Sequence, residues 1–536
     1  MDLPNPILDA SHETLNSDDG SSQHPTLASD EHKDICIIGA GPSGLGALKV
    51  LLDHPLFKVG VWEVVAFEAR ESVGGVWLPA KSSSTPDRAN PPPTPLYDAL
   101  TTNLPHPVMA YPSFSFPPST PLFPPASTVL RYLETYAETF NLTQHIRFNH
   151  RVVDTRWDAA KRKWRVQVRE GRSGEEKTQE YDLVVVANGH YSLPRYPTTP
   201  GLQAWLDAGK ATHSVYYRNP THPPCLEKVE TVLVVGSGPS GLDISSELRT
   251  AGHKRIVHSF TGAVNEDLEG GGVKRRGRVR TFLDPTRGEV EFEDGTREIG
   301  IGHCVLATGY QDHFQFLHPP ELRLDFPPGI PPLPAELYNS SYHVFPLAKH
   351  IFPLATTYPP SSIAFLGLPV RVVPFPLIEA QMRAVLEVLE RPESLDTTQE
   401  AVDIVSRYED LRAQITARQP SLPPSQLPFA IAKIWHILEE EHQFNYRDAL
   451  HAFAGYKQEK WRVPAWVREM YPMKLVLRQK WRELEKNGEA EEWVKGVGEG
   501  GTEEWVQLMK KVLRRAEERR KGLDDVDDVE RQRTRL

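Results

Sequence analysis

The feature that most constrains this chain is an apolar segment, residues 34–38, that runs directly into three glycines spaced as Gly-x-Gly-x-x-Gly. In such a turn Gly39 permits the sharp change of direction, and Gly41 lets the backbone approach a pyrophosphate. Gly44 lets the following helix pack closely on the strand, and the positive end of that helix faces the phosphates. The pattern therefore predicts a strand, turn and helix that bind a dinucleotide.

A carboxylate in the right place supports this prediction. Glu68 ends the next apolar run, residues 59–67, and a carboxylate there can hold a pair of ribose hydroxyls. A glycine pattern alone often serves only a turn. The strand before it and Glu68 after it therefore carry the prediction.

A second unit of the same kind lies farther along the chain. The apolar run 231–235 leads into Gly236, Gly238 and Gly241 with the same spacing, and a helix-like stretch follows. Two such units in one chain suggest two different dinucleotides held by adjacent domains. The economical pairing is FAD on the first unit and NADPH on the second, with hydride passing between the two rings.

The second unit differs from the first where its second strand ends. His258 and Ser259 are expected at the place that Glu68 occupies in the first unit, so no carboxylate is available for a 2′-hydroxyl. The basic run 274–276 lies downstream, and a 2′-phosphate is therefore the better-fitting ligand.

Charge and cysteine content exclude several classes of protein. The formal net charge is −10, and residues 1–32 hold seven acidic residues without any Lys or Arg. The remainder then carries only about −3 (−10 + 7), which gives no reason to expect nucleic acid. The three cysteines are isolated and suit a reducing compartment rather than a disulfide framework, a metal site or a redox pair. Since a disulfide reductase needs paired cysteines beside its flavin, oxygen is the expected electron acceptor.

We expect no transmembrane segment and no secretory signal, because no apolar run approaches the length that spans a bilayer. The expected location is the cytoplasm, with peripheral association with the endoplasmic reticulum and a homo-oligomer left open.

The predicted fold class is α/β, with two Rossmann-like dinucleotide-binding domains and a helical C-terminal extension. The NADPH domain is predicted to be inserted into the FAD domain. The expected segments are a disordered acidic leader (1–32), the first part of the FAD domain (33–225), the NADP domain (226–310), the second part of the FAD domain (311–390), a helical C-terminal region (391–520) and a charged tail (521–536).

Several short motifs follow one another in a fixed order over residues 33–390. They are Gly39–Gly44, Phe67-Glu68, Gly74-Gly75-Val76-Trp77, Thr102-Asn103-Leu104-Pro105, Gly209–His213 with Tyr217-Arg218, Gly236–Gly241 and Ala307-Thr308-Gly309-Tyr310. In this order they resemble the flavin-containing monooxygenases. Leu96-Tyr97 before Thr102 and the Gly367-Leu368-Pro369 segment resemble the fungal members of that family.

The resemblance implies an enzyme that uses FAD, NADPH and molecular oxygen. It would oxygenate a soft nucleophilic nitrogen or sulfur atom of a small molecule through a C4a-hydroperoxyflavin, with exclusion of water as the main protein contribution. The alternatives are a Baeyer–Villiger monooxygenase, which expects Trp with Pro or Asp where Tyr217-Arg218 stand, and a pathway-specific N-hydroxylase. A non-enzymatic flavin-binding scaffold would have no use for the second glycine unit.

The resemblance also implies the site residues, and no metal ligand is among them. FAD would contact Gly39, Gly41, Pro42, Ser43, Gly44, Glu68, Val76 and Trp77, with the backbone of Val152 beside the adenine. NADP would lie along Gly236, Gly238, Ser240, Gly241, Leu242 and Asp243. Thr102 and Asn103 would lie beside both cofactors, and the catalytic Asn103 amide would hydrogen-bond the flavin-bound oxygen. Without the resemblance, Val152 is equally a core residue and Asn103-Leu104-Pro105 only a turn.

Two positions depart from the family pattern. Asp207 stands where a Phe is usual two residues before Gly209, and Trp205 or Leu206 is expected to fill that apolar role. Thr261 stands where an Arg is frequent two residues after Ser259, so the 2′-phosphate contact must come from elsewhere. His213 is expected to couple the two domains.

Overall fold

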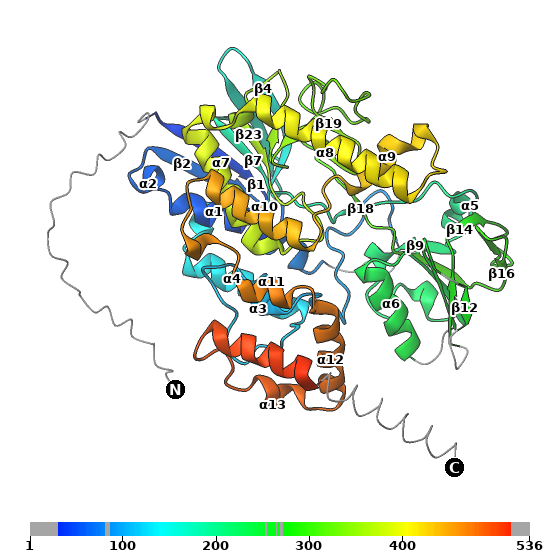
Figure 1. The fold of residues 1–536 in the computed structure, drawn as a ribbon. Helices are drawn as coiled ribbons and strands as arrows, with labels where there is room; N and C mark the ends of the chain where they lie inside the picture. Colours follow the sequence, from blue (N-terminus) through cyan, green and yellow to red (C-terminus); the bar gives the residue numbers. More distant parts are fainter. Residues whose placement is uncertain (1–30, 81–85, 252–254, 264, 268–271, 516–536) are drawn as a thin grey trace.

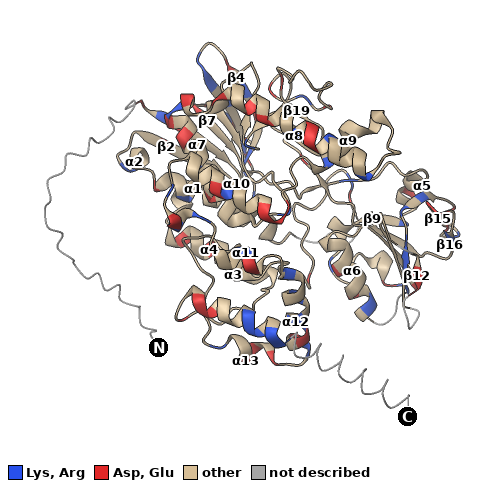
Figure 2. Cartoon of the chain, viewed as in Figure 1, with Lys and Arg blue, Asp and Glu red and all other residues tan. Residues whose placement is uncertain are grey.

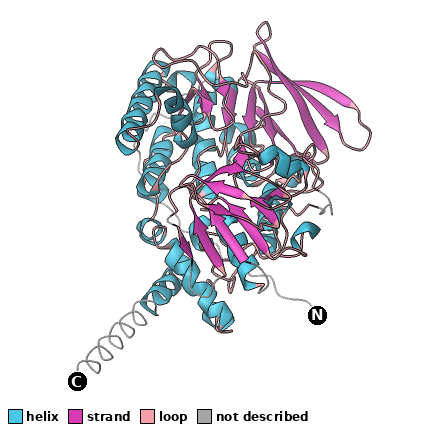
Figure 3. Cartoon of the chain, turned by 90° about the vertical axis from the view of Figure 1, so that its right-hand side faces the viewer, coloured by secondary structure: helices cyan, strands magenta, loops and turns pink. Residues whose placement is uncertain are grey.

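The computed structural model contains two groups of strands flanked by helices, with the C-terminal helices beside both groups (Figures 1 and 3). It describes residues 31–80, 86–251, 255–263, 265–267 and 272–515. The predicted charged tail and almost all of the predicted leader lie outside the described residues. The predicted α/β class is confirmed, and the elements follow the expected alternation of strand, glycine turn and helix.

The first sheet contains five parallel strands in the order β23-β7-β1-β2-β3. Its strands are β1 (Lys33–Ile38), β2 (Trp62–Phe67), β3 (Ile146–Arg147), β7 (Leu183–Val186) and β23 (Ile363–Phe365). Helix α1 (Pro42–Leu52) follows β1, and helix α7 (Pro374–Glu390) follows β23. The edge strand β23 therefore returns to this sheet after the chain has built the second one.

The second sheet contains six strands in the order β12-β13-β11-β10-β17-β9, all parallel except β12. Its strands are β9 (Ala211–His213), β10 (Thr231–Val235), β11 (Arg255–Ser259), β12 (Glu266–Asp267), β13 (Val273–Arg276) and β17 (His303–Leu306). Helix α6 (Pro239–Thr250) follows β10 as α1 follows β1.

The two sheets repeat one backbone arrangement, and this corrects one sequence prediction. The Gly39 N–H donates to Phe67 O at 2.9 Å, and the Gly236 N–H donates to Ser259 O at 2.8 Å. Phe67 and Ser259 are therefore equivalent, and the residue equivalent to Glu68 is Phe260. The expectation that His258 or Ser259 takes that place was wrong by one or two residues. No carboxylate stands at the equivalent position, as predicted.

Two chain crossings join the sheets. Strands β8 (Leu193–Pro194) and β18 (Tyr310–Gln311) belong to these crossings and pair with each other in antiparallel fashion. Two small antiparallel sheets and two short ladders complete the strands. They comprise β4 (His150–Asp158), β5 (Lys163–Glu170) and β6 (Glu176–Tyr181); β14 (Val279–Phe282), β15 (Val290–Phe292) and β16 (Arg297–Glu298); β19 (Tyr338–Asn339) and β20 (Val344–Phe345); and β21 (Leu347–Ala348) and β22 (Phe352–Pro353).

Further helices and irregular segments make up the rest of the described chain. The further helices are α2 (Pro55–Lys58), α3 (His106–Met109), α4 (Ala126–Thr139), α5 (Leu202–Asp207), α8 (Thr397–Arg418), α9 (Leu427–Ile434), α10 (Glu440–Phe453), α11 (Ala465–Met470), α12 (Lys474–Lys486) and α13 (Ala490–Val494). Acidic and basic residues are interspersed along the outer helices in the view of Figure 2. None of the described helices is long and apolar enough to cross a membrane.

Several buried histidines make the stability of this fold depend on pH. Burial lowers the pKa of His213 and His343 to about 4 and that of His106 and His350 to about 3. Their usual pKa is near 6.5, so at neutral pH these rings are uncharged in both the folded and the unfolded chain. Below pH 6.5 these histidines bind protons in the unfolded chain but stay unprotonated in the folded chain until the pH approaches their lowered pKa.

We therefore expect the free energy of unfolding to decrease as the pH falls from about 6.5 towards 4, by up to about 1.4 kcal/mol per pH unit for each such histidine. Thermal unfolding at pH 7.5 and pH 5.5 measures the effect. His106 packs against the rings of Phe116 and Trp505, so His106→Phe is a suitable control. That variant should lose less stability than the wild type between the two pH values, and an unchanged difference would contradict the assignment.

Candidate active site

The first glycine turn leaves no room for a side chain at Gly39 or Gly44. Gly39 has a φ of +106°, and a Cβ there would lie 2.6 Å from Ala187 O at the end of β7. A Cβ on Gly44 would lie 1.9 Å from Gly39 O. The turn therefore needs glycine for its conformation at the first position and for close backbone approach at the third.

Two glycine motifs that are separate in the sequence form one structure. A Cβ on Gly41 would lie 3.1 Å from the Cα of Gly75, and a Cβ on Gly75 would lie 2.8 Å from the Cα of Gly41. The Gly74 N–H also donates to Ala40 O at 3.2 Å. The segment that holds Val76 and Trp77 therefore crosses directly over the turn, and Gly41 is buried beneath it.

Glu68 holds this arrangement together. Its carboxylate is buried and accepts hydrogen bonds from the backbone N–H of Ala40 at 2.8 Å and of Arg70 at 2.9 Å. The Arg70 guanidinium in turn donates to Gly75 O at 3.1 Å and Leu78 O at 2.8 Å. Each Glu68 oxygen keeps a further lone pair, so the carboxylate can still accept ribose hydroxyls.

Helices α1 and α7 bring their N-terminal ends together at the carboxyl edge of the first sheet. A Cβ on Gly367 would lie 2.9 Å from the Ser43 hydroxyl, and one on Gly46 would lie 3.1 Å from the Ile378 side chain. The Tyr111 hydroxyl donates to Pro42 O at 2.6 Å and fixes the start of α1. Two helix N-termini present their positive ends at one place, which suits the phosphates of FAD. Backbone N–H groups for a ligand come mainly from α1, because α7 begins with Pro374 and Pro376 and the Val373 N–H donates to Gln443 Oε1 at 2.7 Å.

The second glycine turn repeats this geometry but lies open. Gly236 has a φ of +116°, and its Cβ would lie 2.3 Å from Ala307 O; a Cβ on Gly241 would lie 2.0 Å from Gly236 O. A Cβ on Gly238, by contrast, would meet nothing within 4 Å, and Gly238 is exposed. The first turn is therefore covered by the segment that holds Gly75, whereas the second lies open to solvent.

The remaining residues predicted for NADP have different environments. Ser240 is half-buried at the start of α6, and Leu242 is 53% exposed. The Asp243 carboxylate already has protein partners: it accepts from the Tyr97 hydroxyl at 2.8 Å and pairs with Arg478 at 2.8 Å. The sequence contained no sign of Arg478, because this residue lies in the C-terminal helices.

The Thr102–Asn103 loop offers one unused amide. The Thr102 hydroxyl donates to Leu104 O at 2.7 Å, and its backbone N–H donates to Pro124 O at 3.0 Å, so the loop is fixed from inside. The Asn103 side chain is exposed and has no hydrogen-bond partner among the described residues. It is therefore available to a ligand.

Other predicted FAD contacts are placed less specifically. Val76 O accepts a hydrogen bond from the Thr94 hydroxyl, and Trp77 is half-buried. Val152 is 7% exposed and lies in a core cluster with Trp164 and Tyr181, which agrees with a structural role. The assignment of Val152 to adenine stays a prediction.

His213 lies where the two crossings meet. Its Nε2 lies 3.0 Å from Gly309 O, its Nδ1 accepts from the Val215 N–H at 3.1 Å, and its ring packs against Tyr310. The neighbouring Arg218 is buried and donates to the carbonyls of Val215 and Tyr217 at 2.8 and 2.7 Å. These two members of the fingerprint therefore hold the backbone at the junction of the sheets.

The first departure from the family pattern has a structural explanation. Trp205 is fully buried, packs on Phe282 and donates to Leu283 O at 3.2 Å, so it supplies the apolar anchor that the pattern expects two residues later. Asp207 points outwards and pairs with Arg88 at 2.9 Å.

The basic run after β11 is already engaged by carboxylates. Lys274 and Arg276 pair with Glu298 at 3.0 and 2.7 Å, and Arg275 pairs with Glu266 at 2.9 Å. A 2′-phosphate would have to compete with these carboxylates. The contribution of this run to NADP binding stays a prediction.

Sequence reasoning missed Asp312, which directly follows β18. Burial raises its pKa to about 7, although the charge of Arg195 opposes that shift. The Asn188 amide, at the end of β7, donates to His313 O at 2.9 Å, so Asp312 lies near the carboxyl edge of the first sheet. A carboxyl group that titrates near neutral pH at such an edge is a candidate for proton transfer.

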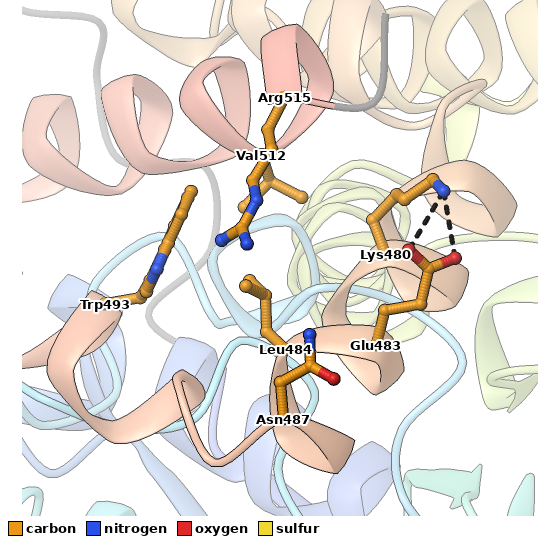
Figure 4. A pocket seen from close by; sticks show the side chains of 7 residues that line it. All are labelled: Lys480, Glu483, Leu484, Asn487, Trp493, Val512 and Arg515. Atoms are coloured by element: carbon orange, nitrogen blue, oxygen red, sulfur yellow. Dashed lines mark hydrogen bonds and ion pairs between the residues drawn. The ribbon is translucent and has the colours of Figure 1, made fainter. Parts of the chain in front are cut away.

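Two cavities lie elsewhere. Figure 4 shows one between the C-terminal helices, where Arg515, Trp493 and the Lys480–Glu483 pair line about 10 Å³, room for about one water molecule. The other, of about 440 Å³, lies at the C-terminal ends of α1 and α7, between Asp53, Glu390 and Trp461. Both are separate from the glycine turns, where the predicted residues gather.

The different surroundings of Gly41 and Gly238 provide a matched test. Both residues have φ near −70° (−74° and −68°), so alanine fits both backbones. Gly41→Ala should push the Gly75 segment away and yield protein with little FAD. Gly238→Ala should keep its stability to within about 0.5 kcal/mol but raise the KM for NADPH roughly tenfold, the effect of about 1.4 kcal/mol. FAD absorbance, thermal unfolding and steady-state kinetics measure these effects; equal behaviour of the two variants would contradict the distinction.

Comparison with known sequences places this geometry in context. The pattern of the family described as flavin-binding monooxygenase-like matches residues 32–266. The flavin-containing monooxygenase FMO GS-OX-like 2 of Arabidopsis thaliana is 30% identical over 492 residues, which cover 86% of this chain and 94% of that protein. The thiol-specific monooxygenase of Saccharomyces cerevisiae is 28% identical over 385 residues, 69% of this chain and 79% of that protein.

Solved structures show the same architecture. S-allyl-L-cysteine S-oxygenase from Allium sativum superimposes with a TM-score of 0.66 at 27% identity, over 84% of this chain and 94% of that one. Tmm from Pelagibacter sp. strain HTCC7211 has a TM-score of 0.62 at 22% identity, over 84% of this chain and 91% of that one. The second likeness concerns the fold alone.

Proposed function

The chain belongs to the flavin-containing monooxygenase family, and from this premise we propose that it oxygenates a soft nucleophilic atom of a small molecule, with sulfur as the first candidate and nitrogen as the second. It is an oxidoreductase that uses FAD, NADPH and molecular oxygen. Bound FAD would supply the redox chemistry, accepting hydride from NADPH and passing one oxygen atom of O₂ to the substrate.

The observation that carries the proposal is a pair of glycine turns that share one backbone geometry but differ in solvent exposure. The enclosed turn at Gly39–Gly44, with Glu68 against it, suits a cofactor that stays bound through many turnovers. The open turn at Gly236–Gly241 suits a cofactor that arrives reduced and leaves oxidised. A scaffold that only bound flavin would have no need of the second turn.

The proposed roles of the site residues follow from their surroundings. Gly41 and Ser43 would hold the FAD pyrophosphate at the start of α1, and Glu68 its ribose. Gly238, Ser240 and the N-terminus of α6 would hold NADP. The Asn103 amide, on a loop fixed by Thr102, would donate a hydrogen bond at the reacting centre, where preorganised donors are most effective.

Sulfur is the first candidate because two relatives, the thiol-specific monooxygenase and the S-allyl-L-cysteine S-oxygenase, are named for it. The chain also has Tyr217-Arg218 where a Baeyer–Villiger enzyme would have Trp with Pro or Asp. A pathway-specific N-hydroxylase stays the second candidate.

The finer assignments stay proposals of the same kind. The domain division at residues 225, 310 and 390 is supported by the return of β23 and α7 to the first sheet. The fungal branch is supported by one relative from a yeast, whereas the Arabidopsis and Allium relatives are plant proteins. A cytoplasmic location stays a prediction from cysteine content, and association with the endoplasmic reticulum and a homo-oligomer have no support in the described residues.

The substrate class can be tested with the purified yellow protein. We expect NADPH to bleach the flavin absorbance under anaerobic conditions, and oxygen to restore it. In air, thiols and sulfides should yield oxygenated products in proportion to NADPH consumed, ahead of tertiary amines and well ahead of cyclic ketones. Mass spectrometry of the products measures the order. Lactones or esters as the main products would favour the Baeyer–Villiger alternative, and a flavin that NADPH does not bleach would contradict the proposal.

Asn103 can be tested by separating product formation from NADPH oxidation. Asn103→Ala should lower oxygenated product about 100-fold, as loss of one preorganised donor does, while NADPH is still oxidised and H₂O₂ is released instead. Asn103→Asp is the control, because it keeps the shape but replaces the amide donor by a carboxylate; it should fail in the same way. Normal yield of product per NADPH in either variant would remove Asn103 from the catalytic machinery.

A further inference from the structure

The first turns of α6 are tied to the C-terminal helices by one carboxylate. Asp243 pairs with both terminal nitrogens of Arg478, at 2.8 Å for Nη2 and 3.2 Å for Nη1, and with Arg482 at 3.2 Å. The side chains of Asp243 and Arg478 are only 11% and 12% exposed. Two-point pairing of a guanidinium with a carboxylate fixes both distance and orientation.

The same carboxylate also reaches the segment that carries the predicted catalytic loop. The Tyr97 hydroxyl donates to Asp243 Oδ2 at 2.8 Å, and the ring of Tyr97 packs against Tyr217. Nη2 of Arg478 lies 3.4 Å from Thr101 O, two residues before Asn103. Asp243 and Arg478 therefore stand where α6, the 97–103 segment and α12 meet.

Helix α12, which carries Arg478, is packed against the rest of the protein, so Arg478 can hold Asp243 in place. Helix α12 buries Leu477, Trp481 and Leu484 on one face, which seats the helix against the body of the protein. Farther along the chain, Val497 O accepts from the Ser119 N–H at 2.9 Å. The ring of Trp505 packs on His106, three residues after Asn103. The C-terminal part of the chain therefore contacts the 101–119 segment at several points.

The charge of Arg478 also matters for an anionic ligand. Asp243 lies about one turn beyond Gly238 and Ser240, where the phosphates of NADP would lie. Burial alone would raise the pKa of Asp243, but the hydrogen bonds and charge of Arg478 lower it, so the group is ionised. Without Arg478 this carboxylate would keep only the more exposed Arg482 and would repel the phosphates more strongly, especially where solvent is excluded.

We propose that Arg478 is a positioning residue for NADPH, which acts through Asp243 to hold the start of α6 at a fixed place against the Thr101–Asn103 loop. The inference rests on the proposed function in that it takes the ligand of the second turn to be NADPH. Arg478 lies outside residues 32–266, so it extends the cofactor site beyond the segment that the family pattern covers.

The test compares four single variants and one double variant, Arg478→Met with Asp243→Asn, of the full-length, FAD-loaded protein. Arg478→Met removes the charge and the pair, Arg478→Lys keeps the charge without the two-point geometry, and Asp243→Asn removes the carboxylate. Arg468→Met is the control, because Arg468 pairs with Asp448 at 2.7 Å between α10 and α11 and does not involve α6. The measurements are the dissociation constant of NADP⁺ by calorimetry, hydrogen exchange of residues 97–103 and 239–250, FAD content, and the share of NADPH oxidation that ends as H₂O₂.

For Arg478→Met we expect a roughly tenfold weaker affinity for NADP⁺, equivalent to about 1.4 kcal/mol, with full FAD content. Hydrogen exchange should be faster in both segments, and more H₂O₂ should be released per NADPH. Arg478→Lys should lie between this variant and the wild type. The double variant with Asp243→Asn should lose less than the sum of the two single losses, since both act through one pair. Arg468→Met should bind NADP⁺ as the wild type does.

Unchanged NADP⁺ affinity in Arg478→Met, even with lower thermal stability, would overturn the proposal and leave Arg478 a purely structural residue. An equal loss in Arg468→Met would overturn it too, because the effect would then be a general loosening of the C-terminal helices. If the wild type fails to oxidise NADPH, the proposed function fails by itself. In that case faster exchange of both segments in Arg478→Met alone would still support the positioning role, and unchanged exchange would overturn it.

Discussion

Close contact between backbone atoms at the two glycine turns is the constraint on which the rest of the structure depends. Gly39 lies against Ala187 O and Gly236 against Ala307 O, with room for no side chain in either place. Each contact brings a helix N-terminus to the carboxyl edge of its sheet. The starts of α1 and α6 can lie there because these residues lack a Cβ, and helix N-termini in such positions are suited to bind anions.

In the proposed function, two otherwise equivalent turns serve different cofactors because their surroundings differ. Gly41 is covered by Gly75, whereas a Cβ on Gly238 would meet nothing within 4 Å, so the first turn is covered and the second is open to solvent. An oxygenase of this kind needs both, because one dinucleotide must remain through many cycles while the other is exchanged in each. The same local geometry thus serves two roles through its surroundings.

Much of the fold was predictable because it depends on local patterns. The glycine spacing and the apolar runs placed β1, α1, β10 and α6. The residue equivalent to Glu68 shows the limit of such reasoning. The sequence pattern predicted where β11 ends, but only the pairing of β11 with β10 shows that Phe260, and not Ser259, is equivalent to Glu68. Similarly, burial of Trp205 explains how the chain tolerates Asp207 two residues later.

The sequence by itself predicted two dinucleotide-binding units, because each glycine pattern follows an apolar strand and the first is followed by Glu68, and the ordered motifs resembled those of the flavin-containing monooxygenases. Only the tertiary structure decided which turn is enclosed, where Asp312 acquires its raised pKa, and that Asp243 pairs with Arg478. Asp243 and Arg478 are 235 positions apart in the chain. Such properties depend on burial and charge contributed by segments that are distant in the sequence. A local sequence pattern does not show which distant segment will pack against it.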